Sequence, residues 1–201
     1  MAAATDLSAN PISALRRSIF ETQRVLEESS SIIIDLSGST LTSLFIQKNK
    51  LYICNVGDSR TVLAKNNSDN FGPLIAVPLS EDHKPELPVE NERINNMGGR
   101  VDQYKDGKGD KAGPYRVWVK HGEYPGLAMS RSIGDQIAKS VGVICDPDIR
   151  EIDIDKDDKF IIIASDGLWE FLSNEEVNFE QLIFFSLKIY ENYFFFIYIV
   201  F

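Results

Sequence analysis

Two stretches of the chain place apolar residues near helical spacing. From Ile12 to about Leu26, apolar side chains recur among charged ones, which predicts an amphipathic helix. The run from Val89 to Met97 follows two prolines and ends at Gly98-Gly99, a pair typical of a helix C-terminus. The segment that follows Pro125-Gly126 is expected to be helical in part.

Other stretches have the apolar runs and turn residues of β structure. Residues 41–65 contain apolar, β-rich runs around Lys48-Asn49-Lys50 and another after Gly57-Asp58, and this order predicts a hairpin meander. Residues 150–164 are expected to form a hairpin that turns at 156–159.

One of these predicted strands is followed closely by an aspartate. Phe160 to Ala164 are apolar on both faces, which suits a strand buried within a sheet, and Asp166 follows almost at once. Asp58 likewise follows a β run at a tight turn. Hard divalent cations such as Mg2+ and Mn2+ prefer carboxylate oxygens, so both aspartates are candidate metal ligands. The alternatives are that Asp166 caps a helix starting at Gly167 and that Asp58 is an ordinary turn acid.

Two other kinds of metal site are excluded by spacing. The acids of "DIDKDD" suggest a calcium loop beginning at Asp153. Asp158 would then stand where such a loop needs glycine, and Ala164 where it needs glutamate. His83 and His121 are the only histidines, which excludes a zinc site of the H-E-x-x-H kind.

Composition narrows the class of protein further. The chain has 201 residues, of which 43% are apolar and 25% charged, as in an ordinary soluble domain. Its formal net charge of -9 argues against nucleic-acid partners, because phosphates require a basic surface. Cys54 and Cys145 lie in apolar stretches and are expected to be small core residues, which favours a reducing, cytoplasmic or nuclear compartment. We expect no secretory signal, since no cationic segment followed by an apolar one opens the chain.

Five motifs occur in a fixed order along the chain. They are "GSTLTSLFIQKNKLYICNVGDSR", "SEDHKP", "ERINNMGGRV", "YPGLAMSRSIGD" and "DKFIIIASDGLWEFLSNEEV". Together they closely resemble the metal-dependent protein phosphatases of type 2C, from about Ile12 to Val177. Each motif alone is weak evidence, but five in the family's order are highly specific.

This resemblance implies a fold, a metal centre and a reaction. The family fold is α+β, an antiparallel β-sandwich of two sheets flanked by helices, with the metals at one end between the sheets. Asp166 matches the strand-end aspartate that ligates the binuclear centre, and Asp58 matches the aspartate associated with a third, weaker metal site. The cofactor would be Mg2+ or Mn2+, and metal-activated water would hydrolyse phosphoserine or phosphothreonine directly. The partners would be phosphoprotein substrates, and we expect a monomer.

The chain also departs from the family pattern. The family's early acidic motif and its D-G-H-G-G-type motif, which carries the proposed general-acid histidine, have no counterpart here. No aspartate follows Asn178, where the family has a final D-N-type motif. We therefore assign no catalytic residue, and we expect an incomplete sandwich, cut at both ends, with impaired hydrolysis. The alternative function is a pseudophosphatase that binds phosphoproteins without turnover.

Smaller motifs are assigned structural roles. Asp82-His83 of "SEDHKP" is expected to hold a loop together, and Arg131 and Asp135 to pair locally. The glycines of "NMGGRV" stop a helix before a turn-rich flap, residues 101–124, with a short β run at 115–119. The resemblance makes this flap a substrate contact region.

The sequence divides into three segments. Residues 1–11 are expected to be a disordered N-terminus, 12–177 a partial phosphatase domain, and 178–201 an aromatic and apolar tail. The tail covers a sheet edge, is an artefact of the gene model, or anchors the chain in a membrane as an interaction protein. The anchor is the minority interpretation, because Lys188, Glu191 and Asn192 lie near the middle of the candidate span.

Overall fold

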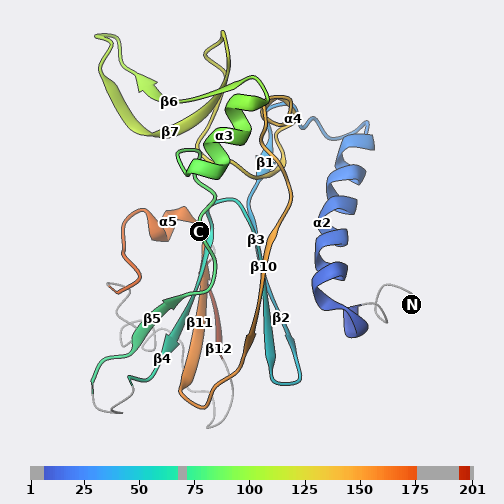
Figure 1. Cartoon of the computed structure of the whole chain (residues 1–201), viewed down its shortest axis with the longest axis vertical. Coiled ribbons are helices and arrows are strands. Elements are labelled where there is room, and N and C mark those ends of the chain that lie inside the picture. The colour runs from blue at the N-terminus through green and yellow to red at the C-terminus, as the bar shows by residue number, and fades with distance from the viewer. Residues whose placement is uncertain (1–6, 68–71, 176–194, 200–201) are drawn as a thin grey trace. The chain divides into compact units, whose positions relative to one another are not determined.

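The chain passes back and forth between two units. A computed structural model describes residues 7–67, 72–175 and 195–199 (Figure 1). The first unit comprises Met1–Leu41, Val56–Asp58 and Asp82–Pro147, and the second Thr42–Asn55, Ser59–Glu81 and Asp148–Phe201.

The described residues of the second unit form two sheets. One has the strand order β10-β3-β2, formed by Asp148–Asp153, Lys50–Val56 and Leu41–Gln47. The other has the order β12-β11-β4-β5, formed by Phe195–Ile199, Asp158–Ala164, Arg60–Lys65 and Ile75–Pro78. β10 pairs antiparallel with β3, and β4 pairs antiparallel with both β5 and β11. The second unit is therefore a sandwich of largely antiparallel sheets.

Strand β11 is buried on both of its faces, as its sequence predicts. Because side chains alternate along a strand, Ile161 and Ile163 pack with Leu51 and Ile53 of β3 and with Leu63 of β4. The opposite face of β11 joins a second cluster, made of Val62, Ala64, Phe160, Ile162, Ala164 and Trp169. Each buried isoleucine contributes about 1.5–3 kcal/mol through removal from water. The strand that leads to Asp166 is thus held firmly from both sides.

Two predicted strand pairings are wrong. The expected meander breaks after β3, since β4 leaves the sheet of β2 and β3 and pairs with β5 and β11. The expected hairpin at 150–164 does not form either, because β10 pairs with β3 while β11 pairs with β4. The physical reason is burial: apolar β11 needs a neighbour on each side and cover on each face. β10, with exposed acids alternating with isoleucines, suits a sheet edge.

The two predicted helices are confirmed in the first unit. α2 spans Pro11–Glu28, and the side chain of Asn10 caps it by accepting a hydrogen bond from the Ser13 amide at 3.2 Å. α3 spans Pro88–Asn96 and ends at Met97, followed by Gly98 with a φ of 82°. Of the N-terminal segment expected to be disordered, residues 1–6 lie outside the described residues and 7–9 are helical.

The flap is more regular than its sequence predicts. β6 (Gly99–Lys105), β7 (Lys111–Val119) and β8 (Pro125–Leu127) form one antiparallel sheet, so the expected single β run at 115–119 was too short. Cross-strand pairing overrides the glycine, lysine and aspartate content of the segment. The core beneath it gathers Ile94, Val117, Ala138, Val141 and Val143. The remaining elements of the first unit are short: α4 (Gln136–Lys139), and β1 (Gly38–Ser39) paired with β9 (Ile133–Gly134).

The predicted tail lies mostly outside the described residues. Within it, only 195–199 are described; they form β12, which pairs in parallel with β11. No helix in the described part of the chain is both long and apolar enough to cross a membrane. The α+β fold class with antiparallel sheets is confirmed.

Candidate metal site

A short helix follows β11 (Figure 1). Asp166 is the first residue of this helix. The N-cap of this helix, α5 (Asp166–Trp169), is Ser165, and no side chain makes a capping hydrogen bond. Asp166 is exposed, and its carboxylate makes no hydrogen bond or ion pair within the described residues. The helix-cap interpretation of Asp166 is therefore wrong, and its oxygens are available to a cation.

Trp169 fixes the helix that carries Asp166. Its indole N–H donates to the carbonyls of Ala164 at 3.0 Å and of Arg60 at 3.2 Å, and its ring lies in the core under β11 and β4. The guanidinium of Arg60 lies 5.4 Å from the ring centroid and donates to Asn174 at 2.7 Å. One buried aromatic residue thus ties the helix to two strands.

Asp58 has a different environment. It lies in the turn between β3 and β4, is only 6% exposed, and accepts a hydrogen bond from the Lys84 ammonium at 2.6 Å. Gly57 precedes it with a φ of 98°, and a Cβ there would lie 2.5 Å from Thr40 Cγ2. The turn therefore requires glycine. A metal at Asp58 would have to displace or outcompete Lys84.

His83 shapes the turn that carries Asp58. Its Nδ1 accepts a hydrogen bond from the Gly57 amide at 2.9 Å, and its own amide donates to the Gly57 carbonyl at 3.0 Å. Its carbonyl accepts from the Ser130 amide at 2.8 Å, and the residue is 2% exposed. The predicted loop-holding role of His83 is confirmed: it links the "GDSR", "SEDHKP" and "SRSIGD" motifs.

Glu90 is a buried acid that sequence reasoning missed. Its carboxylate accepts from Arg93 at 2.7 Å, Arg131 at 2.8 Å and the Ser130 hydroxyl at 2.6 Å. Burial by itself would raise the pKa of Glu90, but these hydrogen bonds outweigh it and lower the pKa to about 2. The ion-pair partner that the structure gives Arg131 is thus Glu90, where the sequence pointed to Asp135. The i,i+3 spacing of Glu90 and Arg93 was the one local signal.

The two predicted metal ligands belong to different units. Asp58 is in the first and Asp166 in the second, so a cleft shared by both stays a prediction. Among the described residues, no group of three or more His, Cys, Asp or Glu side chains is placed to hold a metal ion. Asp166 fits a divalent cation as an exposed oxygen donor, whereas Oδ2 of Asp58 would first have to lose its hydrogen bond from Lys84.

Both cysteines are buried, as predicted, and they are not joined in a disulfide. Burial raises the pKa of the Cys145 thiol, which keeps it protonated and unreactive.

The motifs around Asp58 and Asp166 belong to one extended match. The family model described as protein phosphatase 2C matches residues 3–178. The chain belongs to the protein phosphatase 2C family. It is 43% identical over 151 residues to probable protein phosphatase 2C 73 of Arabidopsis thaliana, a match that covers 75% of this chain and 39% of that protein. It is 46% identical over 142 residues to probable protein phosphatase 2C 48 of Oryza sativa subsp. japonica, covering 70% of this chain and 39% of that protein. The chain thus spans about two fifths of the length of these protein phosphatase 2C relatives.

Solved structures agree on the fold. The serine-threonine phosphatase 2C of Toxoplasma gondii superposes with a TM-score of 0.72 at 23% identity, covering 86% of this chain and 55% of that one. A C. elegans sex determining protein superposes with a TM-score of 0.65 at 21% identity, covering 85% and 36%. The fold is therefore that of the protein phosphatase 2C family, as the sequence motifs predicted.

Proposed function

We propose that the domain represented by this chain hydrolyses phosphoserine and phosphothreonine in proteins with water activated by Mg2+ or Mn2+. The observation that carries the proposal is the exposed carboxylate of Asp166, which makes no hydrogen bond or ion pair within the described residues. It follows a strand buried on both faces, inside a chain that the protein phosphatase 2C model matches over residues 3–178. Phosphoproteins would be the partners.

The residues have separate roles in this proposal. Asp166 would hold a divalent ion, and the hydrogen bonds of Trp169 keep the backbone that carries it in place. Asp58 would contribute to a weaker site, in competition with Lys84. When bound, such ions supply a Lewis acid that lowers the pKa of water and stabilises charge on a phosphoryl group. No side chain of this chain is assigned as the general acid.

A second candidate function is binding of phosphoproteins without turnover. It is favoured by one observation: within the described ranges, no three side chains of the ligating types converge. A carboxylate ligand by itself holds a divalent ion weakly, because Mg2+ and Mn2+ need several oxygen donors.

Release of phosphate from a phosphothreonine peptide tests both candidates. The full chain would be assayed with millimolar Mn2+, beside the Asp166→Asn variant and beside the Arabidopsis relative 2C 73. We expect turnover far slower than that of the relative, and lost in Asp166→Asn. Exposed Asp153, whose ion pair within the described part of the chain is with Lys50 at 3.3 Å, provides a matched control as Asp153→Asn.

The outcomes separate the candidates. Metal-dependent turnover supports the phosphatase function if it is lost in Asp166→Asn and retained in Asp153→Asn. Saturable binding of the phosphopeptide over its unphosphorylated form, with no phosphate released, supports the binding module. If the chain shows no turnover and also no phosphate-selective binding, both candidate functions are contradicted.

A further inference from the structure

Strand β2 forms one edge of its sheet. The strand order is β10-β3-β2, so within the described residues β2 has a neighbouring strand, β3, on one side. All seven residues of β2 are half-buried, and six of them belong to the second unit. An edge strand presents backbone N–H and C=O groups that can pair with a further strand. β2 is therefore a candidate site for the addition of a strand.

The sequence of β2 lacks the features that keep sheet edges from pairing. The segment "LTSLFIQ" contains no charged residue, no proline and no glycine. Natural edge strands commonly carry charges or prolines, because these residues oppose pairing with another chain. A seven-residue segment without charge, proline or glycine is instead typical of segments that associate through their strands.

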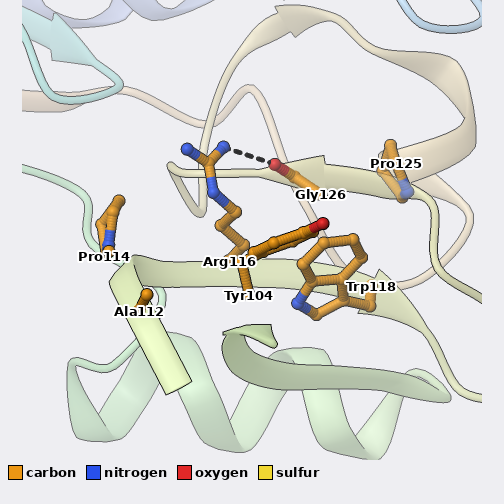
Figure 2. A pocket seen from close by; sticks show the side chains of 8 residues that line it. Tyr104, Ala112, Pro114, Arg116, Trp118, Pro125 and Gly126 are labelled. Carbon is orange, nitrogen blue, oxygen red and sulfur yellow. Dashed lines mark hydrogen bonds between the residues drawn. The ribbon is translucent and has the colours of Figure 1, made fainter. Parts of the chain in front are cut away.

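Three other sheet edges in the described residues do carry such features. β10, at the opposite edge of the same sheet, has four charged residues among its six. β5 has four residues and ends in Pro78. β8 has three residues and begins with Pro125, and Arg116 of β7 donates a hydrogen bond to the Gly126 carbonyl of β8 at 2.7 Å (Figure 2). Of the four edges compared, β2 is the one that is suited to pairing.

Alternate residues of β2 face the core of the second unit. The hydroxyl of Thr42 makes a hydrogen bond of 2.9 Å with that of Thr61 in β4. Leu44 and Ile46 pack against the core cluster formed with β3, β4 and β11. Because side chains alternate along a strand, the residues between them lie on the opposite face. A strand added at this edge must match this alternation, since otherwise its apolar residues would face water.

The sequence of β2 matches an antiparallel copy of itself in one register. With Leu44 opposite Leu44 of the second copy, all seven residues have a partner and Thr42 lies opposite Ile46. Core-facing residues then lie opposite core-facing residues, and Ser43 lies opposite Phe45 on the other face. A shift by one residue would turn the second copy over, with its core face towards water. Since β2 carries no charge, no like charges meet across the pair.

From this edge we infer that two copies of the chain associate by antiparallel pairing of their β2 strands, in a dimer with two-fold symmetry. Backbone hydrogen bonds join the strands, and the pair of Leu44 side chains extends the core across the symmetry axis. This arrangement replaces the monomer that the sequence led us to expect. The dimer does not rest on the function proposed above, because it uses neither candidate metal ligand.

Sedimentation velocity of the full chain in EDTA tests the dimer. An interface of one strand is small, so we expect a dissociation constant on the order of 10 μM. Ser43→Lys should weaken the dimer by about 10-fold or more, because the two lysines would be diagonal neighbours across the pair. Ser31→Lys adds the same charge at an exposed serine outside β2 and should change the dissociation constant by less than about 2-fold.

Disulfide crosslinking tests the register without a change of charge. Ser43→Cys is mixed with an affinity-tagged Phe45→Cys, so that the mixed dimer is recognised by its mass. Opposite residues of an antiparallel pair have Cβ atoms about 4.5–5.5 Å apart, a separation close to that of a disulfide. We expect the mixed crosslink to form about 5-fold or more faster than crosslinks within either variant, whose cysteines are diagonal neighbours. The wild-type chain should not crosslink, because Cys54 and Cys145 are buried.

A wild-type chain that stays monomeric at about ten times the expected dissociation constant would overturn the inference and leave the β2 edge to a strand of another protein. Equal dissociation constants for Ser43→Lys and Ser31→Lys would also overturn it, since another surface would then join the copies. Crosslinks that form as fast within one variant as between the two would contradict the register. Circular dichroism shows whether Ser43→Lys is folded, and if it is not, crosslinking alone decides. Because EDTA removes metal, failure of the dimer leaves the phosphatase proposal standing.

Discussion

The ammonium nitrogen of Lys84 lies 2.6 Å from Oδ2 of Asp58, and the two residues are 26 positions apart in the chain. The side chain of Asp58 is 8% exposed and that of Lys84 is 33% exposed. A carboxylate this buried needs a cation, and in the structure the cation is a lysine. A metal ion at Asp58 would perform the same neutralisation, so lysine and metal compete for one site.

Replacing the lysine should make stability depend on metal. Lys84→Met leaves a buried carboxylate without its partner, so we expect the free energy of unfolding in EDTA to fall by about 1–3 kcal/mol. Millimolar Mn2+ should restore part of this loss in the variant and have little effect on the wild type at this site. Urea unfolding with and without Mn2+ measures both effects. A Lys84→Met/Asp58→Asn double variant is the control, and if it responds to Mn2+ as the single variant does, the competition is disproved.

Glu90 should make the folded state sensitive to acid. Its pKa is lowered to about 2 in the folded state, so its contribution is complete above its ordinary pKa of 4.5 and disappears as the pH falls from there towards 2. The difference corresponds to about 3 kcal/mol at neutral pH, since the side chain is buried. Glu90→Gln should therefore lower stability at pH 7 and flatten its decline below pH 4.5.

Urea unfolding at pH 7 and at pH 3 measures this effect. Glu92→Gln is the matched control, because Glu92 lies exposed on the same helix, α3. If Glu90→Gln and Glu92→Gln have the same pH dependence, the buried network does not set the acid response.

Local patterns predicted those parts of the fold that local interactions decide. The helices α2 and α3 follow from apolar spacing and capping residues, and the buried strand β11 follows from five apolar residues that leave no polar face. The partners of β10 and β11 could not be predicted in this way. Asp153 pairs with Lys50 and Ala164 with Arg60, so the pairings join strands about a hundred residues apart. Two strands that follow each other in the sequence can pair as a hairpin or lie in two different sheets, and their local sequence does not distinguish these arrangements.

The same distinction between local and distant interactions applies to the candidate site. Asp166 and Asp58 were found because each follows a β run and matches a family motif. The ion pairs of Glu90 and Asp58 could not be predicted from the sequence. Glu90 is 41 positions from its partner Arg131, and Asp58 is 26 positions from its partner Lys84. Sequence spacing indicates a buried ion pair only when both members lie on one element, as Glu90 and Arg93 do.

Trp169 should matter for stability out of proportion to its apolar area. Trp169→Phe keeps an aromatic ring but removes the N–H that donates to Ala164 and Arg60 and reduces the surface under Arg60. We expect a loss of about 1–3 kcal/mol in urea unfolding, because a buried carbonyl, that of Ala164, and a partly buried one, that of Arg60, lose a donor. Exposed Phe171→Leu serves as the control and should change stability by less than about 0.5 kcal/mol. A Trp169→Phe variant as stable as wild type would show that α5 is held by apolar packing alone.

The two candidate ligands should differ in their response to Mn2+. Asp166 is exposed and makes no hydrogen bond or ion pair within the described residues, so it can bind a cation without breaking a contact. Asp58 must first give up Lys84. We therefore expect Asp166→Asn to weaken Mn2+ binding by about 10-fold or more, since even indirect contacts to a metal contribute this much. Asp58→Asn should change it by less than about 3-fold.

Titration calorimetry with the full chain measures the Mn2+ affinity of both variants without relying on activity. Lys84→Met extends the test, because it should add a second binding event that Asp58→Asn removes. If Asp58→Asn abolishes Mn2+ binding while Asp166→Asn leaves it unchanged, the assignment of the two aspartates is reversed, and the lysine is then a counter-ion that the metal displaces readily.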